Sequence, residues 1–325
     1  MKVFITGGAG YVGSVLSDYL AEEGYDVTVF DLCIYGKKVF SNAKKINLIQ
    51  GDIRNKSLLK DSLKEQDVVI HLACISNDPS FELNPSLGKS INLDAFEPMV
   101  KIAKNLKIKR FIYASSSSVY GIKNEKNVNE KMSLEPITDY SKFKAECEEI
   151  LMKYQDKNFS TVVVRPATVC GYSKRQRLDV IVNILTNLGF HKKEITIFGG
   201  EQLRPNIHIK DMARVYKLLI EAKNEDVSGE IFNAGWENLK VKDIAHLVKN
   251  ELGNDINLIT TPTNDNRSYH ISSIKIKEKL KFEMKYSILD AVKDLKDAFE
   301  RKLLSDPLNN PEYFNIKKMQ NIKLK

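Results

Sequence analysis

The chain has 325 residues, of which 42% are hydrophobic, and carries a formal net charge of +8. This length and composition allow a large buried core, in one α/β domain or in two coupled lobes. No apolar stretch approaches the ~18 residues that a membrane span requires, so we expect no membrane association and no secretion signal. The four cysteines lack disulfide or metal-ligand spacing, which predicts reduced thiols, no metal site and a cytoplasmic location.

The positive charge favours anionic ligands, which in principle include nucleic acids. The lysines are scattered, however, and no basic patch interleaved with aromatic residues accompanies them. We therefore expect a solvated basic surface, an anionic small ligand such as a sugar nucleotide, and no nucleic-acid partner.

The first half of the chain alternates apolar runs with amphipathic stretches. The first βαβ unit is predicted as a strand at 2–6, a helix at 10–23 and a strand at 26–30. The pattern continues with strands at 46–50, 67–73, 109–114 and 160–165 and helices at 55–64, 85–106 and 139–154. Parallel strands with crossover helices predict a Rossmann-type doubly wound parallel sheet, with ligands at the carboxyl ends of its strands.

A glycine-rich turn, TGGAGYVG at residues 6–13, joins the first strand to the first helix. Its glycines allow a tight turn and a close approach to a pyrophosphate, which rests on the helix N-terminus. Asp31 closes the second strand, where a carboxylate accepts hydrogen bonds from a ribose diol and repels a 2′-phosphate. The turn thus predicts NAD rather than NADP as cofactor, and Asp52, past the third strand, would read the adenine edge. The alternative is a plain turn with Asp31 as a helix cap.

Residues 115–118 are four serines that follow a predicted strand, and Tyr140 and Lys144 share one face at the start of a predicted helix. A free tyrosine titrates near ~10, so a catalytic base at neutral pH needs its phenolate stabilised by roughly 3 units, about 4 kcal/mol. A lysine ammonium and a nicotinamide cation would supply that stabilisation. The alternative is a polar strand end and an ordinary helix cap. His71, at a strand end, is expected to be a packed side chain.

Together these stretches resemble the extended short-chain dehydrogenase/reductase family, in its NAD-dependent sugar epimerase/dehydratase group, over nearly the whole chain. The resemblance is carried by residues 6–13, 51–54, 71–73, Asn92, 115–121, Tyr140-x-x-x-Lys144, 165–166 and 200–204. It implies that Tyr140 is the acid/base, that Lys144 lowers its pKa and holds the nicotinamide ribose, and that Ser116 is the catalytic hydroxyl. It also implies cofactor contacts by Gly7, Gly10, Tyr11, Val12, Asp31, Asp52, Ile53, Leu72, Ala73, Asn92, Tyr140 and Lys144.

Two departures from the family pattern narrow the reaction. Family 4,6-dehydratases carry an Asp-Glu pair after the catalytic hydroxyl, where this chain has Ser117 and Ser118, so dehydration is disfavoured and Ser117 is assigned to substrate binding. Many family 4-epimerases place an asparagine on the substrate diphosphate, where this chain has Thr168. A standard UDP-hexose epimerase is therefore also in doubt.

Past Gly171 the alternation lapses, with helices expected at 180–188 and 211–222 and strands around 195–197 and 206–208. We expect an NAD-binding Rossmann domain with the catalytic residues at 1–170. Residues 171–325 are expected to form mostly a smaller C-terminal α/β substrate-binding lobe, with some segments returning to the main sheet. The resemblance assigns Arg204 and Arg267 to the substrate diphosphate, a role that suits the planar guanidinium. Arg175 and Arg177 are further candidates, and surface ion pairs are the alternative for all four.

Residues 165–179 and 306–316 resemble a subgroup that acts on unusual nucleotide sugars and includes capsule and lipopolysaccharide enzymes, one of which oxidises C4 of a GDP-heptose. The resemblance implies an NAD-dependent enzyme that oxidises a secondary hydroxyl of a nucleotide-activated sugar, at C4, as a 4-epimerase or a C4 dehydrogenase. It further implies surface polysaccharide biosynthesis and a homodimer through the helices at 85–106 and 139–154. A catalytically silent NAD-binding or sensing protein is the alternative from another class.

Overall fold

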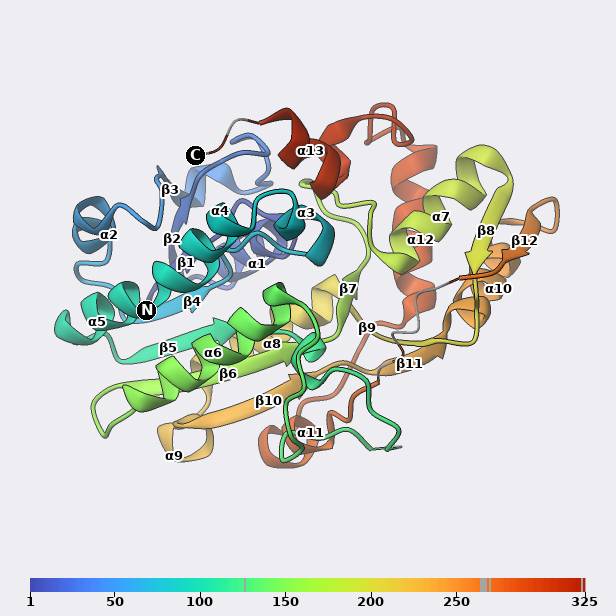
Figure 1. Cartoon of the computed structure of the whole chain (residues 1–325). Helices are drawn as coiled ribbons and strands as arrows, with labels where there is room; N and C mark the ends of the chain where they lie inside the picture. Colours follow the sequence, from blue (N-terminus) through green and yellow to red (C-terminus); the bar gives the residue numbers. More distant parts are fainter. Residues whose placement is uncertain (126, 264–267, 269, 323, 325) are drawn as a thin grey trace.

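The computed structural model describes residues 1–125, 127–263, 268, 270–322 and 324. Its main sheet has seven parallel strands in the order β10-β6-β5-β4-β1-β2-β3 (Figure 1). The strands are β1 (Lys2–Thr6), β2 (Asp26–Asp31), β3 (Ile46–Gln50), β4 (Val68–His71), β5 (Arg110–Ala114), β6 (Ser160–Pro166) and β10 (Glu230–Ala234). The predicted Rossmann-type doubly wound sheet is confirmed. Its order reverses around β1, which places the glycine turn between the ends of β4 and β2.

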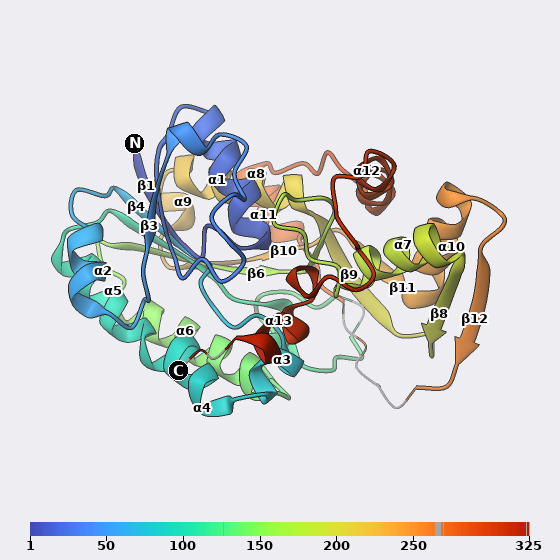
Figure 2. The same cartoon turned by 90° about the horizontal axis from the view of Figure 1, so that it is seen from above.

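Helices cover both faces of this sheet (Figure 2). Val3 and Ile5 belong to a core that includes residues of α1 (Tyr11–Glu22) and α8 (Ile209–Glu221). Phe4, between them in sequence, belongs to the opposite core. That core includes residues of α2 (Lys56–Ser62), α3 (Asp78–Glu82), α4 (Pro85–Lys89), α5 (Phe96–Asn105) and α6 (Asp139–Lys153). Strands buried on both faces require nearly continuous apolar runs, which is why β1, β4, β5 and β6 were visible in the sequence, whereas β10 was not predicted.

One predicted helix is interrupted. The helix expected at 85–106 is present, but it is not one uniform α-helix, because a π-helical turn, η2 (Ser90–Asp94), separates α4 from α5. Within this turn the Asn92 side chain accepts a hydrogen bond from Ile75 N (2.8 Å) and donates one to Ile75 O (3.1 Å). The widened turn therefore ties the helix to the loop after β4, and apolar periodicity alone cannot reveal such an interruption.

Most of the remaining elements form the smaller α/β lobe. A three-stranded sheet contains β7 (Thr168–Cys170), β9 (Leu203–His208) and β11 (Glu237–Lys240), and β8 (Glu194–Phe198) pairs with β12 (Asn257–Thr261). The helices α7 (Ile181–Lys192), α10 (Val241–Leu252) and α12 (Ile288–Glu300) contribute to its core. The short helices α9 (Asn224–Val227) and α11 (Ile274–Leu280) instead pack on the main sheet, where they flank β10.

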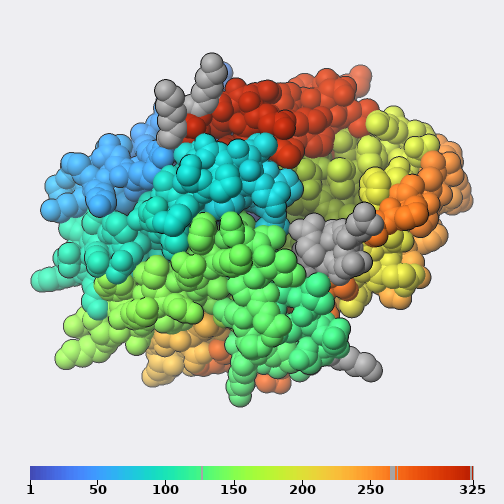
Figure 3. Space-filling view, viewed as in Figure 1, coloured from blue at the N-terminus to red at the C-terminus, as the bar shows by residue number. Residues whose placement is uncertain are grey.

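The C-terminal segment returns from this lobe to the main sheet. After η4 (Pro311–Tyr313), α13 (Asn315–Asn321) packs against α3, and Met319 and Leu324 contact the core beneath α5 and α6. In the space-filling view the segment lies along the top of the molecule, against the chain that follows β4 (Figure 3). The other single turns are η1 (Ala43–Lys45) and η3 (Ser117–Tyr120). No helix within the described ranges is both long and apolar enough to cross a membrane.

Candidate active site

The glycine turn is closed by backbone contacts that leave no space for side chains. Gly7 has φ +73°, and a Cβ there would lie 2.6 Å from Ala73 N, at the end of the neighbouring strand. A Cβ on Gly13 would lie 2.2 Å from Gly7 O. Gly10 precedes α1 and supplies no side-chain cap, so the N–H groups at the start of α1 stay available for an anion.

Asp31 lies beside this turn, at the end of β2. One carboxylate oxygen accepts a hydrogen bond from Ala9 N (3.0 Å) and the other from Cys33 N (2.7 Å). Burial raises the pKa of this carboxyl, while the two N–H groups and the charge of Arg175 act in the opposite direction. A carboxylate offers about four acceptor positions, so two remain for a diol.

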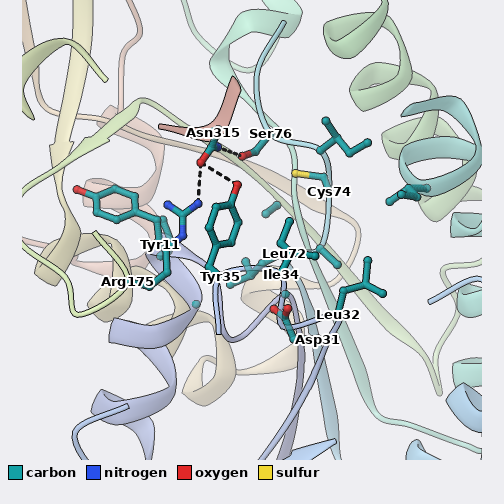
Figure 4. A pocket seen from close by; sticks show the side chains of 18 of the residues that line it. Tyr11, Asp31, Leu32, Ile34, Tyr35, Leu72, Cys74, Ser76, Arg175 and Asn315 are labelled. Atoms are coloured by element: carbon teal, nitrogen blue, oxygen red, sulfur yellow. Dashed lines mark hydrogen bonds between the residues drawn. The ribbon is translucent and has the colours of Figure 1, made fainter. Parts of the chain in front are cut away.

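A cavity of about 240 Å³ opens at the carboxyl ends of the central strands (Figure 4). It brings together residues predicted for three different roles. The predicted site residues that line it are Gly7, Gly10, Tyr11, Val12, Asp31, Ile53, Leu72, Ala73, Tyr140, Lys144, Arg175 and Arg177. The phenol of Tyr11 nevertheless points to the smaller lobe, where it donates to Gly171 O (2.7 Å) and accepts from Asn183 Nδ2 (2.9 Å).

Two predicted cofactor residues lie behind the cavity wall. Asp52 is paired with Arg54 (2.6 Å), and although burial opposes it, the contacts with Arg54 hold the pKa of Asp52 below its usual value. Both polar atoms of the Asn92 side chain are bonded to Ile75, which does line the cavity. These positions support indirect roles. Asp52 would act on the cofactor site through its neighbour Ile53, and Asn92 would act through the loop after β4.

Tyr140 and Lys144 lie one turn apart at the start of α6. A capping box formed by Thr138 and Ser141 fixes where this helix begins. The Lys144 side chain is buried, donates to Ala114 O at 2.6 Å, and places its ammonium 5.9 Å from the centre of the Tyr140 ring. The helix cap and the end of β5 together position the predicted acid/base and its lysine.

The four serines have different surroundings. Ser115 donates its hydroxyl to Glu148, which forms a buried ion pair with Arg165 (2.6 Å). Ser117 is buried and begins η3, and Ser118 donates to Ser116 Oγ (2.9 Å). Of the four serines, Ser116 is the one whose hydrogen bond to the Tyr140 phenol lowers the pKa of the tyrosine. The cavity is lined by Ser115 and not by Ser116, but the bond to the phenol favours Ser116, the third residue before Val119, as the hydroxyl that accompanies Tyr140.

The phenol of Tyr140 is neutral in the protein without ligands. Burial raises the pKa of Tyr140 well above its ordinary value, and the charge of Asp78 acts in the same direction. Arg177 and Ser116 act in the opposite direction. A phenol with this pKa serves as a base only after further positive charge arrives beside it.

His71 is a structural residue, as expected. Its ring is buried against Tyr113, and its Nδ1 shares a hydrogen bond with Thr6 Oγ1 (2.6 Å). Burial, with a smaller contribution from Lys144, lowers the pKa of His71 to about 3, so the ring is neutral at physiological pH.

The predicted substrate residues divide into three groups. Arg175 and Arg177 line the cavity, and Arg177 pairs with Asp179 (2.5 Å). Thr168 in β7 and Arg204 in β9 lie on the three-stranded sheet of the smaller lobe, outside this cavity. Arg267 lies outside the described residues.

The sequence analysis missed several cavity residues. Tyr35 follows β2, Ser76 follows β4, and Asn315 begins α13 at the other end of the chain. Asn315 Oδ1 accepts from Tyr35 Oη (3.0 Å) and Arg175 Nη2 (2.6 Å), and its Nδ2 donates to Ser76 Oγ (3.0 Å), as Figure 4 shows. The only signal toward this group was the likeness of residues 306–316 to one subgroup, which gave no contact.

Comparisons with known proteins agree with this geometry. Residues 3–235 match the model of the NAD dependent epimerase/dehydratase family. The chain is 28% identical over 256 residues to a putative UDP-glucose 4-epimerase of Methanocaldococcus jannaschii, covering 77% of this chain and 82% of that protein. It is 27% identical over 298 residues to the dTDP-D-glucose 4,6-dehydratase of Homo sapiens, covering 85% and 83%.

Among solved structures, the UDP-glucose 4-epimerase of Thermotoga maritima with UDP-glucose superposes with a TM-score of 0.83 and 26% identity. The match covers 94% of this chain and 100% of that one. The chain therefore belongs to the NAD dependent epimerase/dehydratase family. It is an enzyme of the extended short-chain dehydrogenase/reductase type, and its cofactor is NAD.

The residues of the cavity fit this cofactor. The closed glycine turn and the uncapped start of α1 suit a diphosphate, and Asp31 has acceptor positions left for a ribose diol. Ile53, Leu72 and Ala73 add apolar surface for the rings. Bound there, NAD supplies a hydride acceptor.

Proposed function

We propose that the chain is a nucleotide-sugar 4-epimerase that oxidises the C4 hydroxyl of its substrate to a ketone and reduces the ketone on the other face. The proposal rests on one observation, which is that Tyr140 and Lys144 line the same cavity as the glycine turn and Asp31. A proton-transfer group beside a nicotinamide site is what the oxidation of a secondary alcohol requires.

In the proposed mechanism, Ser116 holds the substrate hydroxyl by a hydrogen bond while Tyr140 Oη accepts its proton. The C4 hydrogen would pass as hydride to bound NAD, so that a C=O bond forms at C4 as the O–H and C–H bonds break. Lys144, buried and held by Ala114 O, keeps positive charge beside the phenol. In the return step Tyr140 gives the proton back to the C4 oxygen.

The residues after Ser116 argue against a dehydratase. A 4,6-dehydratase needs groups that protonate and deprotonate carbons 5 and 6, and the family uses carboxyl groups at the two following positions. Here those positions hold Ser117, which is buried, and Ser118, which is bonded to Ser116. A hydroxyl is a poor general acid or base near neutral pH. The ketone is therefore expected to be reduced or released without loss of water.

A second candidate is a C4 dehydrogenase that releases the 4-keto sugar, with a GDP-heptose as one possible substrate. Thr168, where many family 4-epimerases have an asparagine, favours a substrate other than a standard UDP-hexose. The C-terminal segment at the cavity, part of the stretch that resembles the unusual-sugar subgroup, favours it too. Either activity would suit the biosynthesis of surface polysaccharide sugars.

The test is a panel of UDP-, GDP-, CDP- and dTDP-sugars incubated with the enzyme and followed by NMR. A 4-epimer without net NADH supports the epimerase. A 4-keto product with stoichiometric NADH supports the dehydrogenase. Loss of water at C5 and C6 would contradict both, and so would the absence of turnover with every sugar while NAD is bound.

We further propose that the substrate lobe begins at residue 171.

We also propose a cytoplasmic homodimer built on α5 and α6, whose Ile102 and Ile150 are only partly buried in the single chain. Light scattering after size-exclusion chromatography tests the dimer, since a single-chain mass at micromolar concentration would contradict it.

A further inference from the structure

Arg175 is a buried cation that faces the cavity. Its residue is 4% exposed, and it lines the same cavity as the glycine turn. Its guanidinium stacks on the Tyr35 ring, 3.4 Å from the ring centre, and donates to Asn315 Oδ1 (2.6 Å) and, at 3.4 Å, to Gln176 O. Its Nε is buried and has no hydrogen-bond partner among the described residues. The side chain is fixed in place, yet part of its donor capacity is unused.

Arg175 also has no direct ion-pair partner among the described residues, although the charges of Asp31 and Asp179 act on it from a distance. Within the described part of the chain no carboxylate forms an ion pair with it, since Asp179 is paired with Arg177 and Asp31 accepts from backbone N–H groups. Burial lowers the pKa of Arg175, which reflects the cost of this desolvation. A buried guanidinium that no carboxylate contacts directly is costly, so its retention indicates an anion that binds in the cavity.

The topology indicates which anion this is. Tyr35 follows β2 and Ser76 follows β4, and these two strands flank β1 on either side. The glycine turn follows β1, so the group Tyr35, Arg175, Asn315 and Ser76, here named the Asn315 cluster, joins the two sides of that turn. A diphosphate on the turn lies between the segments that the cluster connects.

We propose that Arg175, together with the glycine turn, binds the diphosphate of NAD, and that Asn315 of the C-terminal segment is a positioning residue that holds Arg175 there. This inference rests on the NAD dependence in the proposed function. It assigns Arg175 to the cofactor instead of to the nucleotide sugar. It also makes the C-terminal segment part of the cofactor site, because Asn315 ties it to both sides of the turn.

The variants that test this are R175Q, R175K and N315A, with R301Q as a matched control. Arg301 has a 64% exposed side chain, pairs with Asp297, and does not line the cavity. Calorimetry on nucleotide-free protein measures the affinity for NAD, ADP-ribose and UDP. Fluorescence of bound NADH, chased with excess NAD, measures the dissociation rate on protein that retains its cofactor.

A charge-assisted hydrogen bond contributes about 1.5–3 kcal/mol, so R175Q should weaken NAD and ADP-ribose by about 10- to 100-fold. The NAD affinity of R175K should lie between those of R175Q and wild type, because lysine keeps the positive charge but lacks the planar guanidinium with its several donors. N315A should speed NADH dissociation, and R301Q should change nothing. The affinity for UDP should stay as in wild type in all four variants.

Two results would overturn the inference. Unchanged NAD affinity in R175Q would do so, and so would a loss confined to UDP, which would assign Arg175 to the substrate diphosphate. If R175Q does not fold by circular dichroism, R175K and N315A decide, and wild-type NAD affinity and NADH dissociation in both overturn it. Failure of wild-type protein to bind NAD would instead contradict the proposed function.

Discussion

The ammonium of Lys144 lies 5.9 Å from the centre of the Tyr140 ring and donates a hydrogen bond to Ala114 O at 2.6 Å. The first contact follows from the four-residue spacing on α6, and the second ties the lysine to the last residue of β5. Because both groups line the cavity beside the glycine turn, a buried cation and a phenol are held where hydride chemistry is expected.

Replacing Ser115 and replacing Ser116 should have different effects. S116A should lower kcat by about 10- to 100-fold, because it removes the hydroxyl beside Tyr140. S115A should leave kcat near wild type and lower the free energy of unfolding by about 1 kcal/mol, because Ser115 donates to the buried Glu148–Arg165 pair. Turnover and urea unfolding of both variants check this. The reverse pattern would move the catalytic hydroxyl to Ser115.

Asp31 should set the preference between cofactors. Replacing Asp31 with Asn removes the charge that repels a 2′-phosphate, so the ratio of NADP to NAD dissociation constants should fall by about tenfold or more. The variant also leaves an amide facing a backbone N–H, which costs about 1–3 kcal/mol of stability. Titrating one preparation with both cofactors gives a ratio of dissociation constants that does not depend on this loss of stability. An unchanged ratio would remove Asp31 from cofactor selection.

The pH dependence of turnover should report Tyr140. Its pKa is raised by burial and opposed by the charge of Arg177, and the base form exists only above that pKa. The activity should therefore rise with pH, and R177Q should move the rise in kcat/KM to higher pH because an opposing cation is lost. R177K, which keeps the charge, is the control. A shift to lower pH in R177Q would be incompatible with this electrostatic role.

His71 should make the fold less stable in weak acid. Its folded-state pKa is about 3, below the ordinary value of 6.5, so between these values the unfolded chain binds more protons. Stability contributed by the neutral ring is thus complete above pH 6.5 and falls as the pH drops toward 3. In H71F the decrease in unfolding free energy from pH 7 to 5 should be smaller than in wild type. Equal slopes by urea titration would indicate that His71 is not buried as a neutral ring.

Much of the fold was predictable because its signals are local. Strands such as β1 and β4 are apolar runs buried on both faces, and the glycines at 7 and 13 stand where backbone contacts exclude a Cβ. The pairing of Tyr140 with Lys144 needs only a helix at the right place, which the capping box at Thr138 provides.

The rest depends on tertiary contacts that leave no periodic signal. Asn315 meets Tyr35 and Arg175 across 280 and 140 positions of sequence, so no spacing rule connects them. The π-helical turn around Asn92 arises from its bonds to Ile75, a residue on a separate loop. The sequence made Arg175 a candidate for substrate binding, but its position beside Tyr35 became visible only in the folded chain.

The most direct measurement is the turnover of Y140F on the nucleotide sugar that wild type converts, followed by NMR, with NAD affinity and thermal stability measured alongside. Positioned acid–base groups contribute about 100- to 10,000-fold, so the rate should fall by that factor while NAD binding and melting temperature stay as in wild type. Tyr25→Phe, which removes a surface phenol bonded to Glu221, is the control and should turn over normally. A Y140F rate within about threefold of wild type would contradict the account.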